Sequence, residues 1–277
     1  ERQRLSVGMR PKEITICEDE TFHPETCLVA IEPVSDFILV EQYAQSRTAT
    51  EWTHTLKQAT AGLAVKIIQS TSDEGKGIVK HVQDDLGAQH SPDLFHVQQE
   101  LTRGPGVAIA NKTRCAEQVL AAAVQKVTDY TAKAANLSGT PGADGAAELE
   151  RLIAQVRQTE VAARQTQETL VPQQERVKQA IQSLSTDYHP YDLETGAPRS
   201  TEALAVALNE HFATLEQVAA AANLSDHCLQ KIAKAKRVVV TMVATLAFFW
   251  LTLRAKVEAL ALPPAVERAV YDHLIPA

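Results

Sequence analysis

Three short apolar runs within the first 43 residues constrain the fold of this chain more than any other feature. They cover 13–18, 27–33 and 37–43, and each is rich in the β-branched and apolar residues that strands favour. The links between them are too short for the crossover that parallel neighbours need. We therefore expect three antiparallel strands.

The next segments alternate between helical and strand patterns, with Thr48 or Thr50 as the N-cap of the first helix. We expect a helix over 50–62, a strand over 64–70, a helix over 75–86 and a strand over 92–97. The order β-β-β-α-β-α-β predicts a mixed sheet with helices packed on it.

From residue 111 onward the chain reads as almost entirely helical, because Ala, Gln, Leu and Glu crowd this half. A breaker-rich segment over 138–145 separates the first two helices and favours an antiparallel coiled-coil hairpin. Pro172 interrupts the apolar stripe of the second helix and predicts a kink or a restart there. The helices are expected over 111–136, 146–184, 201–221 and 225–260, with a short one from Ala265.

Composition narrows the functional classes. The formal net charge of −7 argues against a general nucleic-acid binder, but not against an enzyme with an acidic metal site. The four cysteines form no C-x-x-C pair, so neither a zinc site nor a disulfide framework is expected. A start without a signal-peptide core favours a cytoplasmic protein. The uncharged run 238–253 is shorter than the roughly 20 residues of a membrane span, so we expect a buried core helix and no membrane association.

Acidic residues follow two of the expected strands. The first strand ends in Glu18, Asp19 and Glu20, and Asp73 comes directly after the fourth. Neighbouring strand ends would let Asp19 and Asp73 share Mg²⁺ or Mn²⁺, because these hard cations prefer carboxylate oxygens. Asp19 is preferred because consecutive side chains alternate between the two faces. Two plainer interpretations stay open, namely Asp73 as a helix N-cap and a solvated end for the first strand.

Five short motifs stand in a specific order between residues 13 and 200. They are Asp19, Glu20 and Phe22; 29–35 (VAIEPVS); Asp73 with Lys76; 91–101 (SPDLFHVQQEL), with its D-x-F-H pattern; and 188–196 (YHPYDLETG). In this order and spacing they resemble the DDE-type transposases of bacterial insertion sequences. The resemblance implies an α/β fold, with an RNase H-like mixed sheet in residues 1–110 and a long all-α insertion in residues 111–277.

The resemblance also implies a reaction. Such transposases cleave transposon ends and join the 3′-hydroxyl to target DNA, with Mg²⁺ or Mn²⁺ as cofactor. It implies that Asp19 and Asp73 are the catalytic metal ligands, that DNA is the partner, and that the chain forms a homo-oligomer in the bacterial cytosol or nucleoid. A third acid is expected beyond Ala277, because Glu258 and Glu267 lie in no recognisable motif.

Three further residues are candidates for supporting the two acids. They are Glu20, Asp93 and His96, of which the last two belong to the D-x-F-H pattern. The plainer interpretation makes Asp93 a turn residue and His96 a partly buried strand residue.

Basic residues form two small clusters that are candidates for DNA contact through charge-assisted bonds to phosphate. The same clusters are also ordinary solvated helix faces. They are Lys112 and Arg114 in one helix, and Lys231, Lys234, Lys236 and Arg237 before the apolar run.

Two other functional classes stay open. A non-enzymatic helical scaffold, or an inactive transposase relic, would account for the hairpin and the missing third acid. An RNase H-like nuclease unrelated to mobile elements would account for the two acids at their strand ends.

Overall fold

The computed structural model describes residues 6–22, 24–137 and 143–275, and the chain divides into two compact units. Unit 1 comprises Glu1–Gln98, Ser185–Asn209 and Arg237–Ala277. Unit 2 comprises Gln99–Leu184 and Glu210–Lys236. Two segments that lie in the expected helical insertion therefore belong to the unit that contains the sheet.

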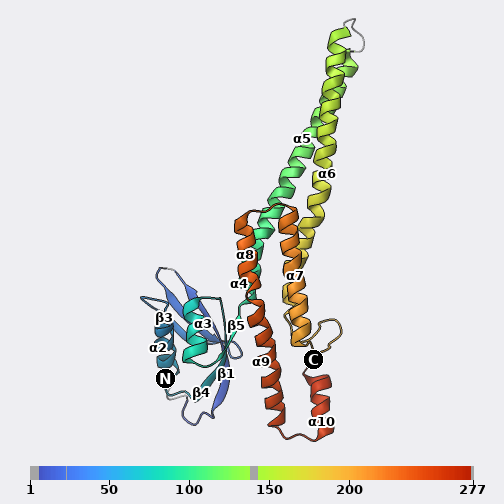
Figure 1. Cartoon of the computed structure of the whole chain (residues 1–277). Helices are drawn as coiled ribbons and strands as arrows, with labels where there is room; N and C mark the ends of the chain where they lie inside the picture. Colours follow the sequence, from blue (N-terminus) through green and yellow to red (C-terminus); the bar gives the residue numbers. More distant parts are fainter. Residues whose placement is uncertain (1–5, 23, 138–142, 276–277) are drawn as a thin grey trace. The chain divides into compact units, whose positions relative to one another are not determined.

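Unit 1 is built on a five-stranded mixed sheet with the order β3-β2-β1-β4-β5 (Figure 1). β1 pairs with β2, and β2 with β3, in the antiparallel sense, whereas β1–β4 and β4–β5 are parallel. The predicted α/β class and the predicted order of elements are confirmed. The strands are β1 (Lys12–Thr21), β2 (Cys27–Glu32), β3 (Phe37–Tyr43), β4 (Val65–Ser72) and β5 (Gln89–Pro92).

Two helical segments cover one face of this sheet. α2 (Ala49–Thr60) starts at Thr48, whose side chain accepts a hydrogen bond from the Glu51 amide, as predicted for an N-cap. α3 (Lys76–Lys80) continues into the π-helical turn η1 (His81–Asp85). The core between them and the sheet includes Ile14, Ile16, Leu28, Ala30, Leu39, Val40, Trp52, Leu56, Ile78 and Val82.

The predicted strand over 92–97 is wrong, because β5 lies earlier and α4 (Leu94–Leu101) occupies most of that range. Asp93 causes the change of structure. Its side chain accepts a hydrogen bond from the Phe95 amide, and its carbonyl accepts one from the Val97 amide, which together begin a helix.

The predicted helix over 225–260 is also divided, into α8 (Asp226–Lys236) and α9 (Val239–Glu258), with a turn between them. α9 belongs to unit 1 and contacts β5, and α10 (Pro264–Ala269) and η3 (Val270–Leu274) follow it. Together α8 and α9 are long and apolar enough to cross a membrane by length and composition. α9 is only partly buried, since Val240 and Leu251 are exposed whereas Met242 and Leu246 are buried.

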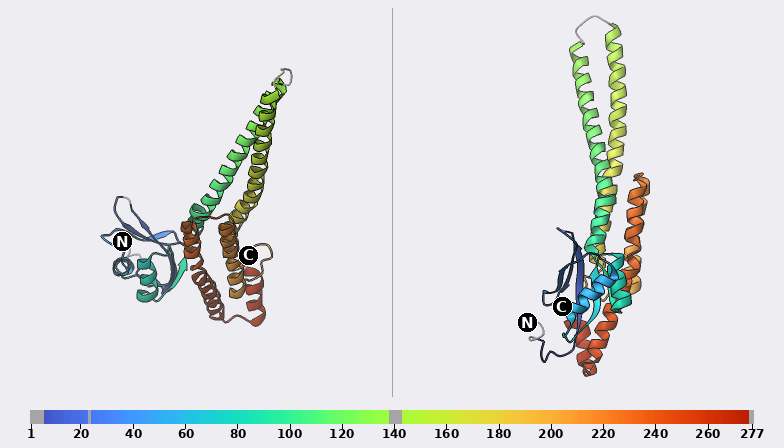
Figure 2. Two further views of the ribbon diagram at one scale, coloured as in Figure 1. Left: turned by 45° about the horizontal axis from the view of Figure 1, so that its top comes forward. Right: turned by 90° about the vertical axis from the view of Figure 1, so that its left-hand side faces the viewer.

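Unit 2 contains two long helices that run antiparallel beside each other (Figures 1 and 2). α6 (Ala143–Asp187) passes through Pro172 without a break, so the predicted restart there is wrong. Pro172 is exposed, so water can solvate the carbonyl that the missing amide leaves free. The helical segments that lie wholly or partly in unit 2 are α4, η2 (Thr102–Gly106), α5 (Val107–Leu137), α6 (Ala143–Asp187), α7 (Thr201–Ala221) and α8.

Candidate functional site

The carboxyl ends of β1, β4 and β5 lie next to one another, because these three strands are parallel neighbours. Cys17 pairs with Thr71, and Thr71 pairs with Ser91. Paired residues of a parallel sheet point to the same face, so these three side chains form one row across the strands.

An aspartate stands two residues beyond each member of this row. Asp19 lies in β1, Asp73 follows β4 and Asp93 follows β5. The Asp93 amide donates to the Ser72 carbonyl at 2.7 Å, so the pairing of the two strands extends to Asp93. By the strand register, the three aspartates therefore stand at corresponding positions at the ends of neighbouring strands. We call Asp19, Asp73 and Asp93 the acid row.

One carboxylate of the acid row, Asp93, acts on the Cys17 thiol of β1. Burial raises the pKa of Cys17, and the charges of Asp93 and then Glu18 raise it further. Asp93 comes after β5, two strands away from Cys17 in β1. Its effect on the thiol places the Asp93 carboxylate near the end of β1.

Each carboxylate of the acid row is held by the backbone of its own strand end. Asp19 Oδ1 accepts from the Glu20 amide at 2.8 Å, and Asp73 Oδ1 accepts from the Gly75 amide at 2.9 Å. A side chain at Gly75 would put its Cβ 2.7 Å from Asp73 Oδ1. The alternative that made Asp73 a helix N-cap is wrong, because Gly75 is the N-cap of α3 and no side chain caps that helix. Asp73 instead closes a turn onto the Gly75 amide.

Asp93 carries a second partner. Its Oδ1 accepts from the Phe95 amide at 2.8 Å, while its Oδ2 lies 2.8 Å from His96 Nδ1. His96 is part of α4 rather than of a strand, and it is partly exposed. The two D-x-F-H residues therefore form a hydrogen-bonded pair at one end of the acid row.

The acid row has the donor chemistry of a magnesium or manganese site, since it consists of carboxylate oxygens. Within the described residues, however, no three His, Cys, Asp or Glu side chains lie close enough to hold one ion. Side chains of the row would have to turn away from their backbone amides to share a cation.

Glu20 lies on the opposite face of β1 from Asp19. Trp52 Nε1 donates to its Oε1, and an Arg47 guanidinium nitrogen donates to its Oε2, both at 3.1 Å. Glu20 thus fixes the end of β1 against the start of α2.

A buried polar cluster lies beneath the acid row, on the face that α2 and α3 cover. Ser70 Oγ donates to Glu18 Oε2 at 2.5 Å, and His81 Nε2 lies 3.4 Å from Glu18 Oε1. Thr53 donates its single hydroxyl hydrogen to Asp85 at 2.6 Å. His81 Nδ1, 2.7 Å from Thr53 Oγ1, must therefore be the donor in that contact. The Glu18 and His81 side chains are completely buried.

This cluster has little signature in the sequence. Glu18 continues the buried alternation of Ile14 and Ile16, so its inward direction could have been read from the pattern. His81 offered no comparable signal, because it lies in a short helical turn.

A second buried imidazole supports the ends of β4 and β5. His90 Nε2 lies 3.0 Å from Ser72 Oγ. Burial lowers the pKa of His90, which favours a neutral ring at this position.

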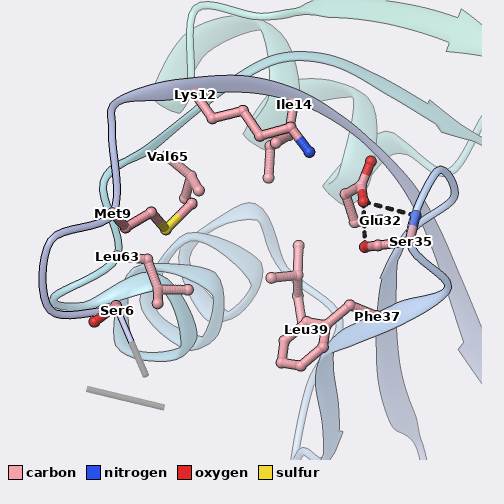
Figure 3. A pocket seen from close by; sticks show the side chains of 10 residues that line it. All are labelled: Ser6, Met9, Lys12, Ile14, Glu32, Ser35, Phe37, Leu39, Leu63 and Val65. Carbon is pink, nitrogen blue, oxygen red and sulfur yellow. Dashed lines mark hydrogen bonds between the residues drawn. The ribbon is translucent and has the colours of Figure 1, made fainter. Parts of the chain in front are cut away.

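A separate cavity of about 280 Å³ lies near the start of β1 (Figure 3). Its lining is mainly apolar. The Glu32 carboxylate accepts hydrogen bonds from the Ser35 hydroxyl and from the Ser35 and Val34 amides. The Ser35 hydroxyl is the main cause that lowers the pKa of Glu32. This carboxylate therefore stabilises a turn.

The basic candidates lie mostly in helices of unit 2. Lys231 pairs with Glu100 at 3.3 Å, and Lys236 pairs with Glu216 at 2.9 Å. Arg114 donates to Asn111 within its own helix. The remaining candidates are Lys112 in α5, Lys234 in α8 and Arg237 in the turn after α8.

Comparisons of the chain with protein-family models, with curated proteins and with solved structures find no match.

Proposed function

We propose that this chain is a metal-dependent phosphoryl-transfer enzyme that acts on DNA, of the DDE transposase type, with an RNase H-like catalytic fold. The observation that carries the proposal is the acid row, in which three aspartates occupy corresponding positions at the ends of three parallel strands. The strand order supports it, because in RNase H-like sheets too the first strand pairs antiparallel with one neighbour and parallel with the other.

In this proposal Asp19 and Asp73 hold Mg²⁺ or Mn²⁺, and Asp93 supplies the third carboxylate within the chain. When bound, such cations activate an attacking hydroxyl and neutralise the charge that develops on the phosphate. The protein positions the carboxylates. Gly75 leaves room for Asp73, and the buried Glu18 anchors β1 immediately before Asp19.

The reaction on DNA would be cleavage at transposon ends and transfer of the 3′-hydroxyl to target DNA. Homo-oligomerisation and a place in the bacterial cytosol or nucleoid belong to the same proposal. The alternative function, a self-association scaffold, is favoured by the long α5–α6 hairpin, which exposes Val119 and Val161. The scaffold predicts no role for the acid row.

The test is nicking of supercoiled plasmid DNA by the full chain with Mn²⁺. We expect Asp19→Asn and Asp73→Asn each to slow nicking by about 10³-fold, equivalent to about 4 kcal/mol of transition-state stabilisation. Asp84→Asn is the matched control, because Asp84 is an exposed aspartate outside the acid row. Circular dichroism verifies that each variant folds. A wild-type chain that does not nick, or an Asp73→Asn chain as fast as wild type, contradicts the proposal.

A further inference from the structure

A groove of about 430 Å³ opens beside the acid row within unit 1. Asp93 belongs to both features, since it lines the groove and ends the acid row. β4 and β5 supply one side of the groove, α9 supplies another, and the segment around Tyr188 and His189 supplies a third. Whatever occupies the groove therefore lies next to the acid row.

The groove contains a network of uncharged polar side chains. Gln69 Nε2 donates to Ser91 Oγ at 2.6 Å, and Ser91 Oγ lies 3.1 Å from Thr245 Oγ1. Thr245 gives its single hydroxyl hydrogen to the Thr241 carbonyl, so it accepts from Ser91. Thr245 also bonds the Tyr188 hydroxyl, and burial raises the pKa of Tyr188. Amide and hydroxyl groups both donate and accept hydrogen bonds, so they suit the polar edge of an uncharged ring.

Flat side chains complete the lining. Phe249 on α9 keeps 36% of its surface exposed, and the rings of Tyr188 and His189 line the same groove. Aromatic rings of this kind stack on any of the four nucleobases, because every base has a flat π face.

The charges of the lining distinguish a base from a phosphate. Among the described residues that line the groove there is no Lys or Arg, and Asp93 is the one carboxylate. A phosphate inside the groove would find no Lys or Arg to pair with, whereas an uncharged base needs none. Binding sites for small organic groups usually have volumes of about 300–1,000 Å³, so this groove is large enough for a base with its sugar.

We propose that the groove receives one unstacked nucleobase of the DNA strand whose phosphodiester lies over the acid row. This inference rests on the proposed function and adds a substrate subsite to it. Phe249 stacks on the base, and Gln69 hydrogen-bonds its edge. Unstacking a base from a duplex costs a few kcal/mol, so the groove favours DNA that is single-stranded or distorted at the reacting position.

The test compares two fluorescein-labelled single-stranded dodecanucleotides of equal charge, one with all four bases and one abasic throughout. Fluorescence anisotropy measures their binding to the full chain at low salt with Ca²⁺, so no turnover is required. We expect wild type to bind the strand with bases about tenfold more tightly than the abasic strand. Phe249→Ala should reduce this ratio to about one while leaving the affinity for the abasic strand unchanged. Gln69→Leu should lower the ratio without removing an aromatic ring.

Leu251→Ala is the matched control, because Leu251 is an exposed apolar residue of the same helix that does not line the groove. It should keep the wild-type ratio. A ratio of one in wild type, or an unchanged ratio in Phe249→Ala and Gln69→Leu, contradicts the nucleobase subsite. Neither result bears on the metal site proposed for the acid row. Binding of neither strand overturns both proposals, whereas loss of nicking in the Asp73→Asn chain supports the acid row independently of the groove.

Discussion

The two units differ in what they bury. Of the buried polar and charged side chains among the described residues, only Thr113 belongs to unit 2. The interior of unit 2 is otherwise apolar, and includes Ile109, Leu184, Phe212, Leu215 and Ile232. The buried polar and charged residues of unit 1 are Glu18, Glu32, Thr55, Ser70, Ser72, His81, His90 and Ser91.

We interpret the apolar interior of unit 2 as serving stability alone, and the buried polar groups of unit 1 as also holding particular residues in place. A buried polar group costs free energy unless it is paired, so an interior without such groups is the simpler solution for a helical hairpin. Most buried polar groups of unit 1 lie under the ends of the strands that carry the acid row. We infer that they fix those strand ends, at a cost in stability that apolar residues would avoid.

The largest loss of stability in unit 1 should come from His81→Ala. The substitution removes the imidazole that faces the completely buried Glu18 carboxylate, so we expect the free energy of unfolding to fall by about 3–5 kcal/mol. Thr113→Val is the counterpart in unit 2. Thr113 donates to the Ile109 carbonyl of its own helix, and we expect a change below about 1 kcal/mol. Urea denaturation of both variants measures the two values, and similar losses would remove the distinction between the units.

A smaller difference in stability should separate alanine substitutions at two glycines, one in each unit. At Gly77 an added Cβ would lie 2.2 Å from the Arg47 carbonyl oxygen, so the backbone would have to shift. We expect Gly77→Ala to lower the free energy of unfolding by about 1–3 kcal/mol. At Gly106, in unit 2, the closest atom would be 3.4 Å away, an ordinary contact.

Gly106→Ala should therefore leave stability unchanged or raise it by up to about 1 kcal/mol, because alanine restricts the unfolded chain. Thermal unfolding followed by circular dichroism compares the two variants. Equal destabilisation by both substitutions would show that the close approach at Gly77 does not constrain unit 1.

Much of the sheet could be predicted from sequence, because its first strands are apolar runs with short links. The errors came where one residue changes the local structure. Phe95 and Val97 resemble alternating strand residues, but Asp93 caps a helix before them. Placing the last strand three residues too late also hid the position of Asp93 directly after a strand end.

Other features left no local signal. The turn between α8 and α9 contains neither proline nor glycine, so periodicity alone predicted one helix. The contacts of His81 with Thr53 and Glu18 join segments far apart in the sequence, and only the folded chain brings them together. Asp19 could be chosen over Glu18 because alternation along a strand is a local rule, and the structure places the two on opposite faces of β1.

The most direct test of the acid row is Mn²⁺ binding to the full chain, followed by electron paramagnetic resonance of the free ion. If the three aspartates share a cation, Asp19→Asn and Asp93→Asn should each weaken Mn²⁺ binding by at least about tenfold, because each removes a carboxylate ligand. Asp84→Asn should bind as wild type does. Unchanged affinity in both acid-row variants would contradict a shared metal site and, with it, the proposed chemistry.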